Sequence, residues 1–214
     1  MASTISGVPG NDVITVDESD VGKIDVVELP NADATEIAIN SAIKGLELGL
    51  SGEKDVAIAG ARLKDSKISN EAPKGETVNV TLAVTKAANL EFSTTGKAAT
   101  ELSVAEGKFL NSSIATAKGK AEDSISFGAS STIKGASISL GKGSDTLTFS
   151  GRMKGKTTVE SGKGRDLIEV NSKDRGKGKL VLSDFNKKDT LVVGDETFTT
   201  KNLDEAPNWV KFDA

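Results

Sequence analysis

The sequence predicts an all-β protein: a single-stack parallel β-solenoid of about nine coils with roughly 22 residues per coil. Three observations predict it. One short strand pattern recurs along the whole chain, the same positions of each repeat are apolar, and the composition suits strands and turns. Gly supplies 22 of the 214 residues and aromatic residues only 4%, while Ser, Thr, Val, Ile and Lys are plentiful. Right-handed winding is expected, because it is the default for parallel crossovers.

The recurring strand has five residues and returns at nearly constant spacing. Its first residues are separated by 23, 19, 22, 24, 23, 22, 21 and 23 positions. The segments are DVITV at 12–16, TEIAI at 35–39, KDVAI at 54–58, ETVNV at 76–80, TELSV at 100–104, DSISF at 123–127, DTLTF at 145–149, DLIEV at 166–170 and DTLVV at 189–193. The third and fifth positions of each segment are apolar. Because alternate side chains share one face of a strand, these positions predict two inward ladders, from Ile14/Val16 to Leu191/Val193.

A second apolar position follows about fourteen residues after each strand begins and predicts a second strand in every coil. These positions are Val26, Leu48, Ile68, Leu90, Ile114, Ile138, Val159, Leu180 and Leu203. Between the two strands a single apolar residue, such as Leu63, Leu110, Ile133 or Met153, is expected to fill a corner. Stacking the coils at ~4.8 Å makes a continuous core and a rod of about 40 Å. An antiparallel sandwich also fits the local pattern, but the constant longer period favours the solenoid.

The ends of the stack are expected to differ from its middle. We predict a lead-in over residues 1–11, the solenoid over 12–196 and a cap or tail over 197–214. A parallel stack exposes strand edges at both poles. The aromatic-rich tail is therefore interpreted as a cap, with Trp209 covering the open end, and a C-terminal secretion signal is the alternative. The N-terminal pole, with only a short lead-in, is a candidate for contact with a protein partner or a sister subunit.

The residue types limit the chemistry that the chain can perform. There is no Cys and no His, which removes disulfides, thiolate nucleophiles, Ser-His and Cys-His catalysis and ordinary zinc sites. The carboxylate pairs Asp17/Glu18 and Asp195/Glu196 leave a carbohydrate-acting β-helix as an alternative. A cleft for sugars needs long inserted loops and aromatic side chains, whereas these coils are uniform and aromatic-poor. The expectation is therefore a protein that is not an enzyme.

Charge is distributed unevenly along the chain. The net charge is −4, but residues 1–106 carry 9 basic and 17 acidic side chains, and residues 107–214 carry 18 and 14. This asymmetry suits head-to-tail contacts or docking on an acidic surface, and a solvated lysine-rich face is the plainer interpretation. Lysines in the second half could bind an anionic cell-surface polysaccharide. Nucleic acid is not expected, because one Trp and no Tyr offer no stacking platform.

The N-terminal segment MASTISGVPGNDV has neither a basic start nor an apolar run, so no N-terminal signal peptide is expected. No stretch approaches the roughly 18 apolar residues of a membrane-spanning helix. A virion surface or an extracellular location would then be reached by a C-terminally encoded secretion path or by assembly into a particle.

Two glycine-rich turns carry a candidate metal site. They read GKGSDTL at 141–147 and GKGRDLI at 162–168, and the stretch from about 118 to the end resembles the repeats-in-toxin (RTX) family, whose nonapeptide binds calcium in a β-roll. The resemblance implies that Gly143, Asp145, Gly164 and Asp166 enclose one Ca²⁺ between adjacent coils. The repeats here recur every 21 or 22 residues rather than every nine. In the alternative interpretation the glycines serve tight turns and each Asp caps backbone groups.

These observations favour a non-catalytic structural or surface protein. The leading interpretation is a virion component, such as a bacteriophage capsid decoration or fibre-like protein, that acts as a rigid spacer or attachment element and contacts capsid proteins. The first alternative is a secreted RTX-like calcium-binding module of a surface layer or adhesin, and the second is the carbohydrate-acting β-helix.

Overall fold

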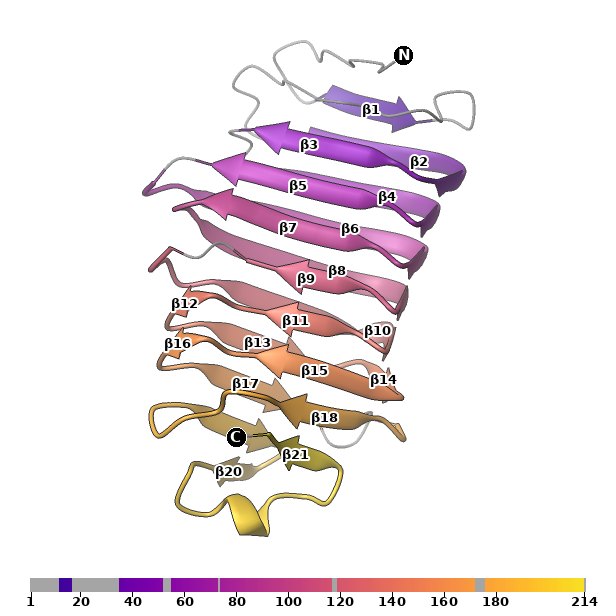
Figure 1. Ribbon diagram of the computed structural model, residues 1–214. Helices are drawn as coiled ribbons and strands as arrows, with labels where there is room; N and C mark the ends of the chain where they lie inside the picture. The colour runs from indigo at the N-terminus through magenta and orange to yellow at the C-terminus, as the bar shows by residue number, and fades with distance from the viewer. Residues whose placement is uncertain are drawn as a thin grey trace.

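The computed structural model describes residues 12–16, 35–51, 55–72, 74–116, 119–171 and 176–213. These residues form a stack of flat coils in which two long parallel sheets face each other (Figure 1), so the predicted all-β parallel solenoid is confirmed. Within the described residues the one helix is the 3-10 turn η2 (Leu203–Glu205). In this part of the chain no helix has the length and apolar character that a membrane crossing requires.

A complete coil contributes strands to both sheets. The first sheet contains β1 (Asp12–Val16), β2 (Thr35–Lys44), β4 (Asp55–Lys64), β6 (Thr77–Ala88), β8 (Ala99–Leu110), β10 (Ser124–Lys134), β13 (Thr146–Phe149), β17 (Leu167–Val170), β19 (Thr190–Val193) and β20 (Glu196–Phe198), with β14 (Arg152–Lys154) beside β10. The second sheet contains β3 (Glu47–Ser51), β5 (Lys67–Ala72), β7 (Glu91–Gly96), β9 (Ser113–Ala115), β11 (Ser137–Ser139), β15 (Lys156–Glu160), β18 (Lys179–Leu182) and β21 (Val210–Phe212). A third, two-stranded sheet pairs β12 (Lys142–Gly143) with β16 (Lys163–Gly164).

The number of complete coils is slightly lower than predicted. Eight coils carry a strand in both sheets within the described residues, whereas about nine were expected. The first-sheet strand of the remaining repeat, β1, is present and pairs in parallel with β2. The second-sheet position predicted for that repeat, Val26, lies outside the described residues, as does the lead-in over 1–11.

The predicted inward ladders are confirmed in the C-terminal half of the stack. Leu102 pairs with Ile125, and the column continues through Leu147, Ile168 and Leu191, all at most 1% exposed. β1 and β2 also pair in the predicted register, with Ile14 opposite Ile37. From β2 to β8 the register differs by two residues; Val56, for example, pairs with Val80 rather than with Val78. A shift of two leaves side chains on the predicted face, so in this part of the stack the faces were right and the pairs wrong.

The second sheet follows the prediction with three corrections. Val159 pairs with Leu182 and not with Leu180. Ile68 pairs with Phe92 and not with Leu90, which lies just before β7. Leu203 is not in the sheet at all, since it begins η2, and the last strand is β21 instead. β21 begins at Val210, seven residues after the predicted Leu203, because the last coil leaves the regular path after β19. Spacing alone could not indicate this departure.

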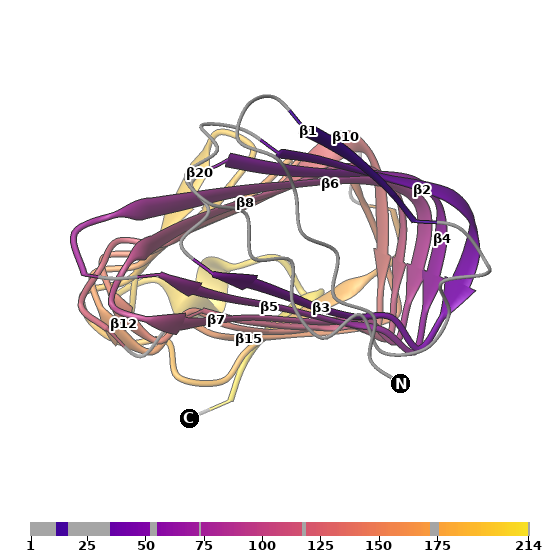
Figure 2. The ribbon, with the colours of Figure 1, turned by 90° about the horizontal axis from the view of Figure 1, so that it is seen from above.

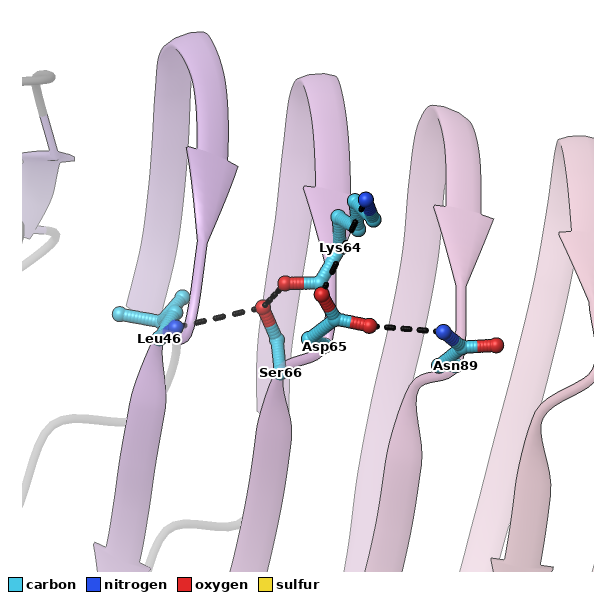
Figure 3. Close-up of polar contacts among 5 residues, drawn as sticks. All are labelled: Leu46, Lys64, Asp65, Ser66 and Asn89. Atoms are coloured by element: carbon cyan, nitrogen blue, oxygen red, sulfur yellow. Dashed lines mark hydrogen bonds and ion pairs between the residues drawn. The ribbon is translucent and has the colours of Figure 1, made fainter.

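The turn into the second sheet uses the left-handed backbone conformation in coil after coil. Its residue has φ of 76° at Gly45, 50° at Asp65, 53° at Asn89, 48° at Asn111 and 71° at Gly135. Gly, Asn and Asp are the residues that adopt this conformation at least cost. Figure 3 shows the polar contacts that join neighbouring turns: Asn89 Nδ2 donates to Asp65 Oδ1 at 2.7 Å. These turn residues therefore form one column along the stack, and the hydrogen bond between Asn89 and Asp65 joins two of its members.

Ser66 ties the same turn to its neighbour (Figure 3). Its Oγ accepts a hydrogen bond from the backbone N–H of Leu46 at 3.3 Å and donates one to the carbonyl of Lys64 at 2.9 Å. Ser112 repeats both bonds with Leu90 and Leu110 two coils further along. The turns are thus held by contacts that run along the stack, as well as within each coil.

Apolar side chains fill the corner beside this turn. Leu63, Ile133 and Met153 are buried there as predicted, but Phe109 and not Leu110 is the buried residue of its coil. Phe109 packs edge-on against Phe127 at 5.7 Å between ring centroids, and Phe127 stacks on Phe149 at 5.4 Å. Aromatic pairs of this kind contribute about 0.5–1.5 kcal/mol beyond their buried area.

The long strands of the first sheet bend before they reach the corner. The pairing of β10 with β8 shifts between Phe127 and Ser130, and β4 pairs with β2 across a similar irregularity. Beyond the bend the strands form one narrow edge of the stack, seen where β2, β4 and β10 turn at the right of Figure 2. The return loops with β12 and β16 form the opposite narrow edge.

The C-terminal end of the stack is built differently. β20 pairs antiparallel with β19, and β21 pairs in parallel with β18. Trp209 is partly buried against the core, and the rings of Phe185 and Phe212 lie 5.3 Å apart. The tail therefore packs onto the last coils.

Candidate functional site

The two glycine-rich turns lie next to each other on the loop edge. β12 and β16 pair in parallel, with Lys142 opposite Lys163 and Gly143 opposite Gly164. Both are labelled at the left of Figure 1. The structure thus brings together all four residues to which the RTX resemblance assigned a metal.

The glycines are needed for close approach of the backbones. A Cβ on Gly164 would lie 1.4 Å from the carbonyl oxygen of Gly143, and a Cβ on Gly143 would lie 2.0 Å from that of Ala121. No side chain fits at either position. The carbonyl oxygen of Gly143 therefore lies against the backbone of the next coil at Gly164.

The two aspartates hydrogen-bond to the preceding coil. Asp145 Oδ1 accepts from the backbone N–H of Asp123 at 2.8 Å, and Asp166 Oδ1 accepts from that of Asp145 at 3.0 Å. Both residues are only 1% exposed. The predicted capping role is thus present, although each carboxylate caps the coil before its own rather than its own strand.

The same contact recurs on both sides, at residues that the sequence analysis did not assign. Asp123 Oδ1 accepts from the N–H of Thr100 at 2.8 Å, and Asp189 Oδ1 accepts from that of Asp166 at 3.2 Å. Asp123, Asp145, Asp166 and Asp189 therefore form one buried aspartate column. The signal that could have revealed three of the four is the spacing Lys-x-x-Asp, which occurs at 120–123, 142–145 and 163–166. Before Asp189 the first position of this pattern is Asn186.

The second oxygens of the column have unequal surroundings. Asp189 Oδ2 accepts hydrogen bonds from the backbone and side-chain nitrogens of Asn186, at 2.8 and 2.7 Å. The Oδ2 atoms of Asp145 and Asp166 are buried and have no hydrogen-bond partner among the described residues. A buried unpaired acceptor is costly, and the cost is lowest when the carboxyl group holds a proton.

Burial shifts the protonation of the column accordingly. It raises the pKa of Asp145 to about 7 and that of Asp166 to about 6, with neighbouring carboxylates adding to the effect and the backbone hydrogen bonds opposing it. Burial also raises the pKa of Asp123. Part of the aspartate column is thus protonated near neutral pH.

The donors at this edge supply only part of a calcium shell. Ca²⁺ takes 6–8 oxygen ligands, and the two unpaired Oδ2 atoms are two such oxygens. The described residues contain no cluster of three or more acidic, His or Cys side chains arranged to hold a metal. The aspartates as placed therefore match backbone caps more closely than a full set of calcium ligands.

Two grooves lie near the remaining candidates. One, of about 710 Å³, is lined by Lys74, Lys97, Lys120 and Lys142, with Glu76 and Glu122 among them. The other, of about 690 Å³, is lined by Glu169, Asp195, Glu196 and Trp209 near the C-terminal end. The second groove combines carboxylates with an aromatic ring, as the carbohydrate-acting alternative requires. The other predicted carboxylate pair, Asp17 and Glu18, lies outside the described residues.

Comparison with known proteins adds no relative: no protein-family model, no curated protein and no solved structure matches the chain.

Proposed function

We propose that the chain is a non-catalytic structural protein of an external surface, most consistent with a virion component such as a bacteriophage capsid decoration or fibre-like protein. It would act as a rigid spacer or attachment element. The observation that carries this proposal is the repetition of the same contacts along the stack. The left-handed turn, the apolar ladders and the aspartate column each recur from coil to coil.

Repetition of this kind supports a mechanical role. Each coil contacts mainly its neighbours, so stiffness is spread along the rod rather than concentrated at one site. The first-sheet column from Leu102 to Leu191 crosses five coils without interruption. A rod of this kind holds whatever is attached to one end at a fixed distance from the other.

Immunogold electron microscopy tests the proposal. An antibody against the purified chain is applied to cultures of the producing cells and to particles collected after lysis. Label on released particles supports the virion assignment, and label on the outer face of intact cells supports an extracellular surface role. Label confined to the cell interior overturns the proposal.

A calcium-binding surface-layer or adhesin module of RTX type is the second candidate. The specific observation in its favour is that two unpaired carboxylate oxygens lie on adjacent coils, at Asp145 and Asp166. Thermal unfolding followed by circular dichroism with excess Ca²⁺ and with chelator separates the two candidates. A large rise in the midpoint with Ca²⁺, as mass action requires for a ligand of the folded chain, and its absence in an Asp145→Asn/Asp166→Asn variant, would favour the calcium module. An unchanged midpoint favours the metal-independent rod.

A further inference from the structure

The narrow edge beyond the bend of the first sheet carries two columns of basic side chains. In one column Arg62 pairs with Lys86 and Lys86 with Lys108. Lys108 then pairs with Thr132, which pairs with Arg152. In the other, Lys44 pairs with Lys64, and Lys134 pairs with Lys154. Ala88 and Leu110 occupy this column on the two coils between Lys64 and Lys134. We call the eight basic residues the basic edge. Taken together, the two columns place at least one cation on each of six successive coils, from β2 to β14. The backbone ladder spaces these cations by the rise of one coil, about 4.8 Å.

All eight side chains point away from the core. In β4, Arg62 and Lys64 are exposed on either side of buried Leu63. In β14, Arg152 and Lys154 are likewise exposed on either side of buried Met153. Residues two apart on one strand share a face and are separated by roughly 7 Å. The basic edge is therefore a strip that runs along the axis of the stack, with two cations on the coils of β4 and β14 and one on each of the others.

Within the described residues, the eight positive charges of this strip outnumber the carboxylates beside it. Asp65 and Glu106 lie in the strand ends and turns that carry the strip, and Glu47 and Glu91 line the groove next to those turns. Lys64 Nζ lies 3.9 Å from Asp65 Oδ2, and both side chains are well exposed, at 60% and 37%. An exposed pair of this kind is weak. No other ion pair within the described residues involves the basic edge.

We propose that the basic edge binds a linear acidic polysaccharide laid along the axis of the stack. The inference rests on the proposed function, because it names the partner to which an attachment element would attach. A polymer with one carboxylate on each sugar presents its charges at intervals close to the rise of one coil. The repeating row of cations and the repeating row of anions can then stay in step over several coils.

The same features fit nucleic acids and membranes less well. Phosphates follow each other at about 3.4 Å along one strand of a duplex, which does not match the coil rise. Single-stranded nucleic acid is held by stacking on aromatic side chains, and the aromatic residue of this edge, Phe109, is buried. Binding at a membrane interface uses exposed apolar side chains beside the basic ones, whereas the apolar residues between the columns are buried in the core.

The opposite edge offers a matched comparison. Lys97, Lys120 and Lys142 line the groove there together with Glu76 and Glu122. Each of the last two lysines is also followed three residues later by a member of the buried aspartate column. Their charge is partly offset by nearby carboxylates, and we therefore assign the polysaccharide to the basic edge.

The test measures binding of the full chain to oligogalacturonate of at least six sugars by isothermal titration calorimetry at low and high salt. One variant carries Lys86→Gln, Lys108→Gln and Arg152→Gln. Its control carries Lys97→Gln, Lys120→Gln and Lys142→Gln, which remove the same charge from the opposite edge. We expect the first triple to weaken binding roughly tenfold or more and to flatten its salt dependence, and the control to change it less than about twofold. Circular dichroism melting checks that both variants are folded.

Equal losses in the two triples would mean that only net charge matters and would overturn the inference. So would a larger loss in the control, no binding by the unaltered chain, or tighter binding to duplex DNA or phosphatidylglycerol vesicles than to oligogalacturonate. A failure here is distinguishable from a failure of the proposed function, because immunogold labelling at an external surface does not depend on this ligand.

Discussion

The backbone N–H of Asp145 donates a hydrogen bond to Oδ1 of Asp166, which lies one coil further along the stack, at 3.0 Å. The side chain of one coil thus completes the backbone bonding of the coil before it. The second oxygen of Asp166 is left buried and unpaired. One carboxyl group therefore both caps a backbone N–H and titrates at a raised pKa. Substitutions that keep or remove the hydrogen-bond acceptor separate these two effects.

Asp145→Asn is expected to flatten the dependence of stability on pH. The carboxyl group titrates near 3.8 in the unfolded chain and near 7 in the folded one. Between these values the folded state binds more protons, so the contribution of Asp145 is fully present below about pH 4 and is lost as the pH rises through about 7. The amide keeps the acceptor for Asp123 and does not titrate. Thermal midpoints measured from pH 4 to pH 8 check this, and parallel curves for the variant and the unaltered chain would contradict it.

Asp145→Ala separates the cap from the titration. It leaves the buried N–H of Asp123 without its partner, which costs about 1–3 kcal/mol. Urea unfolding at a single pH should therefore place this variant well below Asp145→Asn. Equal stability of the two would show that the hydrogen bond contributes little.

The repeat, the faces of the strands and the two-sheet architecture were predictable from the sequence because period 2 and the longer period of about 22 are both properties of residue order. The pairs were less predictable. A two-residue shift such as Val56 opposite Val80 keeps the buried face, so the pattern alone does not distinguish it from the unshifted pairing.

Gly164→Ala should disrupt the loop edge. Its Cβ would lie 1.4 Å from the carbonyl oxygen of Gly143, a backbone atom that no side-chain rotation can move. We expect a loss of roughly 1–3 kcal/mol or failure to fold, measured by urea unfolding. Gly119→Ala is the control, since its Cβ would meet nothing closer than 3.4 Å. Similar losses of unfolding free energy in both variants would show that the clash with the Gly143 carbonyl is not the cause.

Leu147→Asp should unfold the stack. Leu147 is fully buried between Ile125 and Ile168, and an unpaired carboxylate there would cost more than about 4 kcal/mol, a large part of the stability of a domain. Lys142→Ala, on the exposed surface nearby, should stay within about 0.5 kcal/mol of the unaltered chain. Circular dichroism spectra and melting curves compare the two. A cooperative, native-like melting curve of Leu147→Asp would contradict the burial of Leu147 in the apolar column.

Asn89→Ala should destabilise the turn column, whereas Asn89→Gly should not. Asn89 has φ of 53° and donates to Asp65 at 2.7 Å. Alanine in the left-handed conformation costs about 1–2 kcal/mol, and glycine already occupies the equivalent turns at Gly45 and Gly135. Urea unfolding of both variants tests this. Equal stability of Asn89→Ala and Asn89→Gly would mean that the left-handed conformation does not determine which residue is stable at position 89.

The candidate site could be predicted only in part. The motif placed Gly143, Asp145, Gly164 and Asp166 together, but it did not show that the carboxylates already bond to backbone of another coil. It also missed Asp123 and Asp189, because their turns lack the glycines that drew attention to the others. Which groups a side chain meets across coils depends on the register, and local sequence does not encode that directly.

The reversed strand at the C-terminal end has a consequence for assembly. β20 runs opposite to β19, so the first sheet does not present at that pole the strand direction that another copy would need to prolong it in parallel. Lengthwise polymerisation through this sheet is thereby discouraged. The length of the stack along its axis is then set by the number of repeats in the chain, in steps of about 4.8 Å.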